Sequence, residues 1–192
     1  MRTHRHVPIG VWIALAVALA VPSAATAQDD RRFELAAGYS AMRDYDGDVT
    51  FPRGWFASVA VDLAGPLALA GDASGSYKSM GGLDIDLSMN IHTVMGGPRL
   101  VWRTGRVAPY GQMLFGVARF ATTFTIPGET LSDAQTHFAM APGGGIDLRF
   151  SDRGAVRLGA SIRWIRSETF TPAGSEPFTF REFQFIAGVV FR

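Results

Sequence analysis

The chain has 192 residues, of which 18 are basic and 17 acidic, so its formal net charge is only +1. Such a balance gives no electrostatic basis for binding nucleic acid, and no nucleic-acid partner is expected. Cysteine is absent, which excludes disulfides, cysteine-based metal sites and a cysteine-linked lipid anchor. The length suits one domain.

The N-terminus has the pattern of a secretory signal. Basic residues precede an apolar run over residues 11–21, and Ala25-Thr26-Ala27 supplies the small-x-small pattern of a cleavage site. We therefore expect a signal peptide over residues 1–27 and one domain over residues 28–192. Cleavage would remove Arg2 and Arg5 and no acid, which changes the net charge from +1 to about −1. No later run is long and apolar enough for a membrane-spanning helix.

About eight segments of alternating character follow the signal. In each segment, residues of one parity are mainly apolar and residues of the other are mainly Gly, Ala, Ser or charged, which is the pattern of a β-strand with two different faces. In the first segment, for example, Phe33 and Leu35 alternate with Glu34. The expected strands lie at residues 33–40, 55–63, 67–74, 91–103, 108–124, 138–150, 156–164 and 182–192.

The connections between these segments alternate in length. Tight turns are expected at residues 63–66, 103–106 and 151–154, and longer polar loops at residues 43–54, 75–86, 127–135 and 167–177. A sheet with one rim of short turns and one rim of long loops is typical of a β-barrel that crosses an outer membrane.

Two of the expected strands carry a proline well inside their length, at Pro98 and Pro142, and a closed barrel has no free edge to accommodate it. We therefore expect β-bulges there. In the segment 108–124, Gln112 and Arg119 have opposite parity. Either a bulge shifts the register of this strand or Gln112 lies near the membrane interface.

Parity alone does not exclude a soluble lipocalin-like barrel with its apolar face inside. Aromatic residues favour the membrane, because they concentrate at both ends of the apolar faces, as at the two membrane–water interfaces. Beside the short turns these are Phe33, Trp102, Tyr110, Phe150 and Phe191. Beside the long loops they are Tyr39, Trp55, Tyr77, Phe120, Phe138, Trp164 and Phe183. The predicted fold is an all-β, eight-stranded, antiparallel up-and-down transmembrane barrel.

Several motifs resemble the small eight-stranded outer-membrane barrels, namely the OmpA-like transmembrane domain and its OmpX-like relatives. They are Met95-Gly96-Gly97-Pro98-Arg99, Pro109-Tyr110-Gly111, Gly143-Gly144-Gly145-Ile146-Asp147 and the closing segment 185–191. The resemblance implies a location in the cell outer membrane of a Gram-negative-type cell, with both termini periplasmic. It also implies outer-membrane lipid and lipopolysaccharide as surroundings, a monomer, and insertion by the barrel assembly machinery. That machinery commonly reads a terminal aromatic residue; here Phe191 is penultimate and Arg192 is last.

Charged residues of both signs have the parity of the enclosed face. Eight strands leave an interior that side chains nearly fill, so we expect these charges to pair as a structural polar cluster. The candidates are Glu34, Asp62, Asp72, Arg99, Asp147, Arg149, Arg157, Arg163 and Glu182. The alternative role for such a cluster is to line a narrow gated channel for ions or small solutes.

No catalytic, cofactor or metal site is expected. Only His92 and His137 follow the signal, and no Ser–His–carboxylate spacing accompanies them. The stretch Asp44-Tyr45-Asp46-Gly47-Asp48 lacks the glycine position and the last carboxylate of an EF-hand. The sequence therefore predicts a non-enzymatic barrel with an envelope-structural or surface-interaction role through its long loops. An enzyme acting on lipid A or phospholipid, and a channel, are the alternatives.

Overall fold

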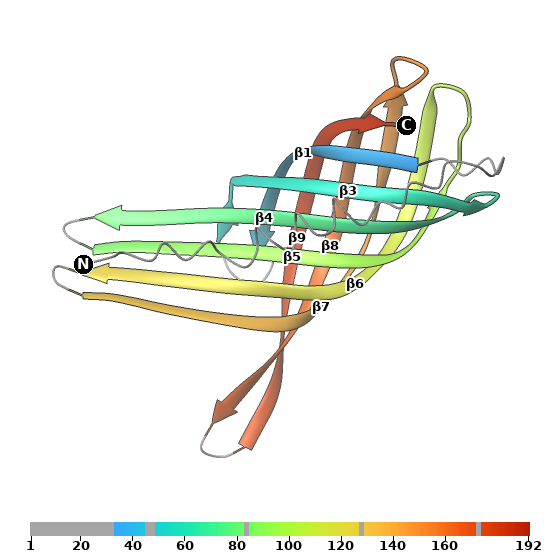
Figure 1. The fold of residues 1–192 in the computed structure, drawn as a ribbon. Coiled ribbons are helices and arrows are strands. Elements are labelled where there is room, and N and C mark those ends of the chain that lie inside the picture. Colours follow the sequence, from blue (N-terminus) through green and yellow to red (C-terminus); the bar gives the residue numbers. More distant parts are fainter. Residues whose placement is uncertain (1–32, 45–48, 83–84, 127–128, 172–173) are drawn as a thin grey trace, which may run out of the picture. The chain divides into compact units, whose positions relative to one another are not determined.

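The computed structural model describes residues 33–44, 49–82, 85–126, 129–171 and 174–192, and its regular structure there is entirely β (Figure 1). Among these residues there is no helix suited to cross a membrane. The expected signal peptide (residues 1–27) lies outside the described part, and so do residues 45–48 of the stretch that was compared with an EF-hand. The strands are β1 (Phe33–Asp44), β2 (Thr50–Phe51), β3 (Arg53–Ala64), β4 (Leu67–Gly82), β5 (Ile85–Val101), β6 (Val107–Ile126), β7 (Glu129–Arg149), β8 (Gly154–Thr171) and β9 (Gly174–Phe191).

The strands pair antiparallel in chain order and the sheet closes on itself. β1 pairs with β3 on one side and with β9 on the other, from Leu35↔Phe191 to Asp44↔Glu182. The two-residue strand β2 pairs with the end of β1 alone. The remaining eight strands therefore form the predicted up-and-down barrel, in which the closed ladder satisfies the backbone without a free edge.

The two rims of the barrel differ in their connections. At the rim that we call the turn end, Gly65 and Gly105 adopt φ values of 56° and 64°, which a residue with a Cβ rarely tolerates. These positions confirm two of the three predicted tight turns, at residues 63–66 and 103–106. At the opposite rim, the hairpin end, pairing continues to Gly82↔Ile85, Ile126↔Glu129 and Thr171↔Gly174. Three of the expected long loops are therefore mostly strand, because polar residues form a ladder equally well outside an apolar layer.

The faces of the barrel confirm the predicted parity. Leu35 is 46% exposed, whereas the next residue, Ala36, is 5% exposed. The exposed positions carry the large aliphatic and aromatic side chains, and the lumen-facing core consists largely of alanine with a few larger residues such as Phe56 and Leu114. A barrel that is apolar outside and polar inside is the arrangement that lipid requires.

Two aromatic residues face the opposite way from the prediction. Tyr110 is 5% exposed and lies in the lumen, and Phe120 packs against the buried residues of the core rather than on the outer face. Strand β6 is apolar on both faces, so alternation alone did not reveal which parity points outward. Its outer face carries Phe115 and Val117 instead.

The bulges expected at Pro98 and Pro142 are absent. The register of β5 and β7 with both neighbours is constant past these residues, and pairing only lapses over residues 97–98 toward β6 and 141–142 toward β8. In an antiparallel strand the N–H and C=O of one residue point to the same neighbour, so a proline interrupts one ladder and leaves the other intact. The register shift that the structure does show lies between Asp62 and Ala64, beside a tight turn.

The register of β6 with β5 and β7 is also constant, so neither interpretation of Gln112 was correct. Gln112 lies in the lumen, where it accepts a hydrogen bond from Arg99. Arg119 is the residue on the outer face, where it is exposed. The opposite parities of the two residues are real and need no shift of register.

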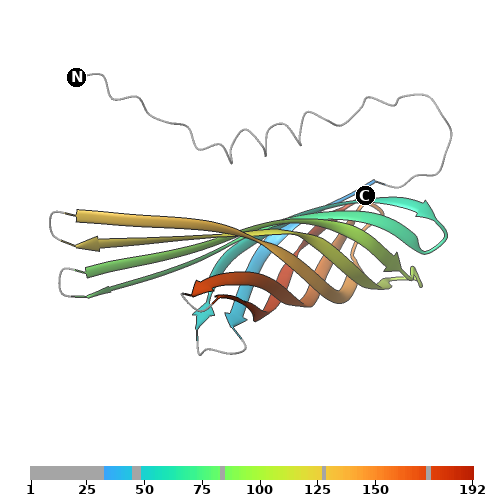
Figure 2. The same ribbon diagram turned by 90° about the horizontal axis from the view of Figure 1, so that it is seen from below.

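Four strands continue beyond the barrel at the hairpin end. Pairing of β3 with β4 ends at Arg53↔Tyr77 and pairing of β7 with β8 begins at Phe138↔Arg166, while β4, β5, β6 and β7 go on pairing with one another. We call residues 78–82, 85–89, 122–126 and 129–137 the projecting sheet. Its two hairpins run side by side, whereas the β8–β9 hairpin leaves in another direction (Figures 1 and 2).

Candidate functional site

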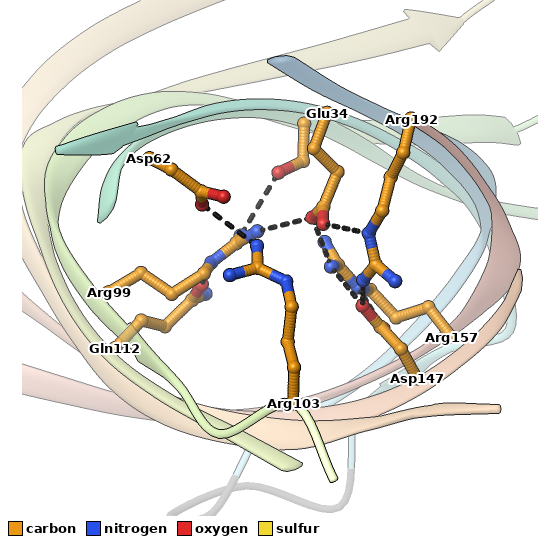
Figure 3. Close-up of polar contacts among 9 residues, drawn as sticks. Glu34, Asp62, Arg99, Arg103, Gln112, Asp147, Arg157 and Arg192 are labelled. Atoms are coloured by element: carbon orange, nitrogen blue, oxygen red, sulfur yellow. Dashed lines mark hydrogen bonds and ion pairs between the residues drawn. The ribbon is translucent and has the colours of Figure 1, made fainter. Parts of the chain in front are cut away.

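Near the turn end, ionised side chains from five strands or strand ends meet inside the barrel (Figure 3). Glu34 of β1 is at the centre. Its Oε1 accepts hydrogen bonds from Arg99 Nη1 at 3.1 Å and from Arg157 Nη2, and its Oε2 accepts one from Arg192 Nε at 2.8 Å. One carboxylate therefore contacts three guanidinium groups from β5, β8 and the residue after β9.

Asp147 of β7 completes this group. Arg157 donates to it through Nε at 2.8 Å and through Nη2 at 2.9 Å, which is the two-pronged geometry that makes arginine–carboxylate pairs strong. Arg192 Nη2 donates to the same carboxylate. We call Glu34, Arg99, Asp147, Arg157 and Arg192 the turn-end network. Neutral groups complete it, because Arg99 also donates to Gln112 and to Ser58.

Tyr110 is held between two of these arginines. The guanidinium carbons of Arg99 and Arg157 lie 5.0 Å and 4.6 Å from its ring centre, which is within cation–π range. Space for the ring comes from two paired glycines. A Cβ on Gly145 or Gly159 would lie 2.8 Å or 2.5 Å from the Tyr110 hydroxyl oxygen. The glycine run of β7 thus admits an aromatic side chain from β6.

A second group lies toward the hairpin end, around Arg163 of β8. Its Nη2 donates to Gln184 at 2.9 Å and to Ser74 at 3.2 Å, and its Nη1 contacts Glu182 at 3.5 Å. Gln184 donates in turn to Ser40, and Ser74 shares a hydrogen bond of 2.7 Å with Thr93. We call this the hairpin-end network; its members are Ser40, Ser74, Thr93, Arg163, Glu182 and Gln184.

Asp72 lies between the two networks. It interacts electrostatically with Arg163, Arg99 and Arg157, and it lines a cavity of about 10 Å³ together with Gln112 and Gln184. Such a volume holds about one water molecule. With Asp72 included, four carboxylates (Glu34, Asp72, Asp147, Glu182) face four guanidinium groups (Arg99, Arg157, Arg163, Arg192), so the two networks together are neutral.

The remaining two predicted lumen residues lie elsewhere. Asp62 accepts a hydrogen bond of 2.8 Å from Arg103 at the turn end, where both side chains are partly exposed. Arg149 has the lumen parity and is partly buried, but no ion pair joins it to the described side chains of either network. Seven of the nine predicted residues therefore belong to or adjoin the two networks.

Sequence reasoning missed several participants. Arg192 ends the last expected strand and Arg103 ends the fourth, but neither was included in the predicted polar cluster. Tyr110 was placed on the wrong face. Gln112, Gln184, Ser40, Ser58, Ser74 and Thr93 are neutral, so a search for charge did not select them. Parity on β9 could have identified Gln184, because it follows Glu182 on the same face.

The side chains of the two networks hold one another through charge-assisted hydrogen bonds. The two histidines lie on opposite faces: His92 is exposed on the outer face with its ring edge-on to Tyr77, and His137 faces inward against Phe120. No group of three metal-ligating side chains occurs among the residues that the structure describes.

Comparison with known proteins identifies the family. A family model described as outer membrane protein beta-barrel domain matches residues 13–191. No curated protein matches the chain. Among solved structures, the chain is similar to Ail, the attachment invasion locus protein of Yersinia pestis, in its complex with the heparin analogue sucrose octasulfate. The identity is 16%, the match covers 85% of this chain and 100% of Ail, and the TM-score is 0.58.

Two further structures agree. Neisserial surface protein A is 13% identical, with 83% of this chain and 94% of that protein covered and a TM-score of 0.57. A major outer membrane protein from Thermus thermophilus is 10% identical, with 83% and 99% covered and a TM-score of 0.55. At these identities the structures establish the fold alone. The family match spans β1 to β9, and the chain therefore belongs to the outer membrane protein beta-barrel domain family and is a protein of the cell outer membrane.

Proposed function

We propose that the protein is a non-enzymatic surface-interaction protein, in which the barrel is the anchor and the projecting sheet binds another protein. The observation that carries this proposal is the free edge of β7. Residues 129–137 pair with β6 on one side, while β8 joins β7 only from Phe138 onward. A long unpaired edge offers a row of backbone donors and acceptors to an extended segment of a partner.

Several observations support this role over the alternatives. The charges inside the lumen pair with one another, and the cavity beside Asp72 has space for about one water molecule; both features support an anchor rather than a channel. The histidines on opposite faces cannot share a substrate, which supports a non-enzymatic protein. Ail, which shares the fold, is described as an attachment protein. An envelope-structural role is compatible with the same anchor.

The surroundings of the barrel are part of the proposal. We propose that residues 1–27 direct secretion and are removed, that the barrel assembly machinery inserts the chain as a monomer, and that lipopolysaccharide surrounds its outer half. The outward aromatic side chains at both ends of the apolar face support these surroundings, for example Phe150, 65% exposed, and Phe138, 56% exposed.

The function can be tested with lysine variants of β7 and β6 at the hairpin end. Ala134 of the free edge pairs directly with Ala121 of β6, which has partners on both sides. Lysine on an edge discourages the addition of a strand. Membrane vesicles carrying the protein would be applied to immobilised extracellular-matrix and serum proteins. We expect Ala134→Lys with Ser132→Lys to abolish adhesion and Ala121→Lys to preserve it. Adhesion no greater than that of empty vesicles, or equal loss in both variants, would contradict the proposal.

A further inference from the structure

Basic side chains are a feature of the outer face of the barrel, among the side chains that the structure describes. Among the Arg, Lys, His, Asp and Glu side chains that the structure describes on this face of the strands, all are basic. Arg53, Arg119, Arg166 and Arg181 are exposed there, and so are Arg43 and His92. The Asp and Glu side chains described in the strands instead have lumen-side parity, as Glu34 and Asp147 do. The acids that neutralise the lumen arginines therefore face away from Arg53, Arg119, Arg166 and Arg181.

The arginines lie at one height. On β1, β3 and β9 the arginine is the sixth outward residue counted from the turn end, after five apolar or small ones. On β8 the same count holds from Val156, because Val156, Leu158, Ala160, Ile162 and Trp164 precede Arg166. On β6, Arg119 has the same place counted from Pro109. Ten residues at about 3.3 Å each, tilted by about 45°, rise by about 23 Å. This is close to the apolar band of such barrels, about 25 Å tall. We call Arg43, Arg53, Arg119, Arg166 and Arg181 the outer basic ring.

Aromatic side chains lie directly below or beside the ring. Arg181 is opposite Trp164 and Arg43 is opposite Phe183 in the register. Trp55, next to Arg53 on the same face, donates a hydrogen bond of 3.0 Å to Tyr77. Tryptophan and tyrosine of this kind mark the level of lipid headgroups, so the basic groups lie at headgroup depth on the side of the projecting sheet.

The ring also brings like charges together. Arg166 is diagonal to Arg181 across β8 and β9. Like charges in such positions repel one another unless an anion lies between them. For Arg53, Arg119, Arg166 and Arg181, no ion pair to another described side chain is present. The lumen arginines, in contrast, are paired.

We propose that the outer basic ring binds the phosphate groups of a phosphorylated glycolipid of the outer leaflet, with bis-phosphorylated lipid A as the ligand. Guanidinium groups match phosphate oxygens in charge and in two-pronged geometry. The apolar face below the ring receives the acyl chains of the same molecule. This inference rests on the proposed surroundings of lipopolysaccharide and does not depend on adhesion through the projecting sheet.

The test compares lipid binding by ring and control variants. Folded protein in zwitterionic micelles is titrated with bis-phosphorylated lipid A, and bound lipid is counted by native mass spectrometry. An arginine at an anionic lipid surface contributes about fivefold in affinity, so we expect Arg119→Gln with Arg166→Gln and Arg181→Gln to raise the Kd about 100-fold. Arg106→Gln with Arg153→Gln, which changes two exposed arginines at the turn end, should leave the Kd unchanged.

Three comparison lipids define what is recognised. Lipid A without its phosphates and phosphatidylglycerol should bind at least tenfold more weakly than bis-phosphorylated lipid A, and inorganic phosphate should compete only weakly. An unchanged Kd in the triple variant would overturn the proposal. Equal binding of dephosphorylated lipid A would show apolar contact only, and equal binding of phosphatidylglycerol would show a general anionic surface; either result also overturns it.

Folding and function are separated by two controls. Each variant is first required to show heat-modifiable migration on a gel, and if the triple variant does not fold, Arg166→Gln and Arg181→Gln are measured singly, each with an expected loss of about fivefold. The vesicle adhesion assay is repeated on the ring variants. If the ring variants lose lipid binding and keep adhesion, the ring is a separate lipid site. If they keep normal lipid binding, the lipid A proposal is wrong, and the adhesion proposal is unaffected.

Discussion

Both networks inside the lumen stabilise buried charges, but they do so with different kinds of partner. In the turn-end network each carboxylate contacts two or three guanidinium groups, so every charge depends on several others. In the hairpin-end network Arg163 has one carboxylate at 3.5 Å and obtains its shorter hydrogen bonds from Gln184 and Ser74. Neutral partners make a buried charge less dependent on any single acid. The two networks should therefore respond differently to the loss of a carboxylate.

The largest effect is expected from Glu34→Gln. This change leaves Arg99, Arg157 and Arg192 with Asp147 as their one carboxylate in the turn-end network. Removing one member of a buried ion pair costs about 3–5 kcal/mol, because the partner charge stays buried. Urea unfolding in lipid vesicles, followed by tryptophan fluorescence, measures the loss. A loss no larger than that of Glu182→Gln would contradict the contrast between the networks.

Gly159→Val tests the packing that supports the turn-end network. A Cβ at this position would lie 2.5 Å from the Tyr110 hydroxyl oxygen and 3.0 Å from Ile186. Moving Tyr110 withdraws its ring from Arg99 and Arg157, and overpacking of this kind costs about 1–3 kcal/mol. The double variant Gly159→Val with Tyr110→Phe, which removes the clashing hydroxyl, should recover most of the stability. No recovery would show that the clash lies elsewhere.

Glu182→Gln should have a smaller effect. Arg163 keeps Gln184 and Ser74, and the new amide oxygen can still accept its hydrogen bond. Weakening one hydrogen bond to a buried charge costs about 1–2 kcal/mol. Ser74→Ala in the same background should add to the loss, because it removes one of the two neutral acceptors. If Ser74→Ala costs no more stability in the Glu182→Gln background than in the unchanged protein, the neutral partners do not compensate for the missing charge.

The smallest effect is expected from Asp62→Asn. The Arg103–Asp62 pair is shorter than the Arg163–Glu182 contact, 2.8 Å against 3.5 Å, but both side chains are nearly a fifth exposed. Partly solvated ion pairs contribute about 0–1 kcal/mol. The same unfolding measurement should show the loss disappear in high salt. A loss of stability larger than that of Glu182→Gln would mean that the length of an ion pair, rather than its burial, decides how much it contributes.

Parity explains how much of the fold was predictable. Where one face must meet lipid and the other an enclosed lumen, residues such as Leu35 and Glu34 cannot exchange places, so strand identity and direction follow from the residues themselves. Strand β6 shows the limit. With Tyr110 and Leu114 on one face and Phe115 and Val117 on the other, hydrophobicity did not distinguish inside from outside.

The candidate site was predictable in membership but not in pairing. Charge on the lumen parity selected Glu34, Arg99, Asp147 and Arg157, because a charge facing lipid is costly, and the structure brings these four side chains together. Which carboxylate meets which arginine depends on the stagger between strands that are far apart in sequence, as for Glu34 and Arg157. Neutral partners such as Gln184 carry no comparable signal. The outer basic ring has a regular position along the strands, but this position becomes visible only after the strand ends have been aligned.

Local backbone details were the least predictable. We expected a bulge at Pro98 and at Pro142, but each strand accommodates its proline by losing the pairing to one of its two neighbours. The polar segments at the hairpin end were expected to be loops, because an apolar face was used to recognise strands. Outside the lipid layer no such face is needed, and ladder pairing between Phe124 and Leu131 or between Thr122 and Asp133 continues without it.

The central claim, that apolar side chains face lipid while charged ones fill a closed lumen, is most directly tested by spin-label accessibility. The chain contains no cysteine, so labels can be placed singly along β3 without background. We predict that oxygen dissolved in lipid reaches labels at Ala57, Val59 and Val61, and that labels at Ser58 and Ala60 are shielded from oxygen. An alternation of the opposite phase, or equal access at all five positions, would contradict the account.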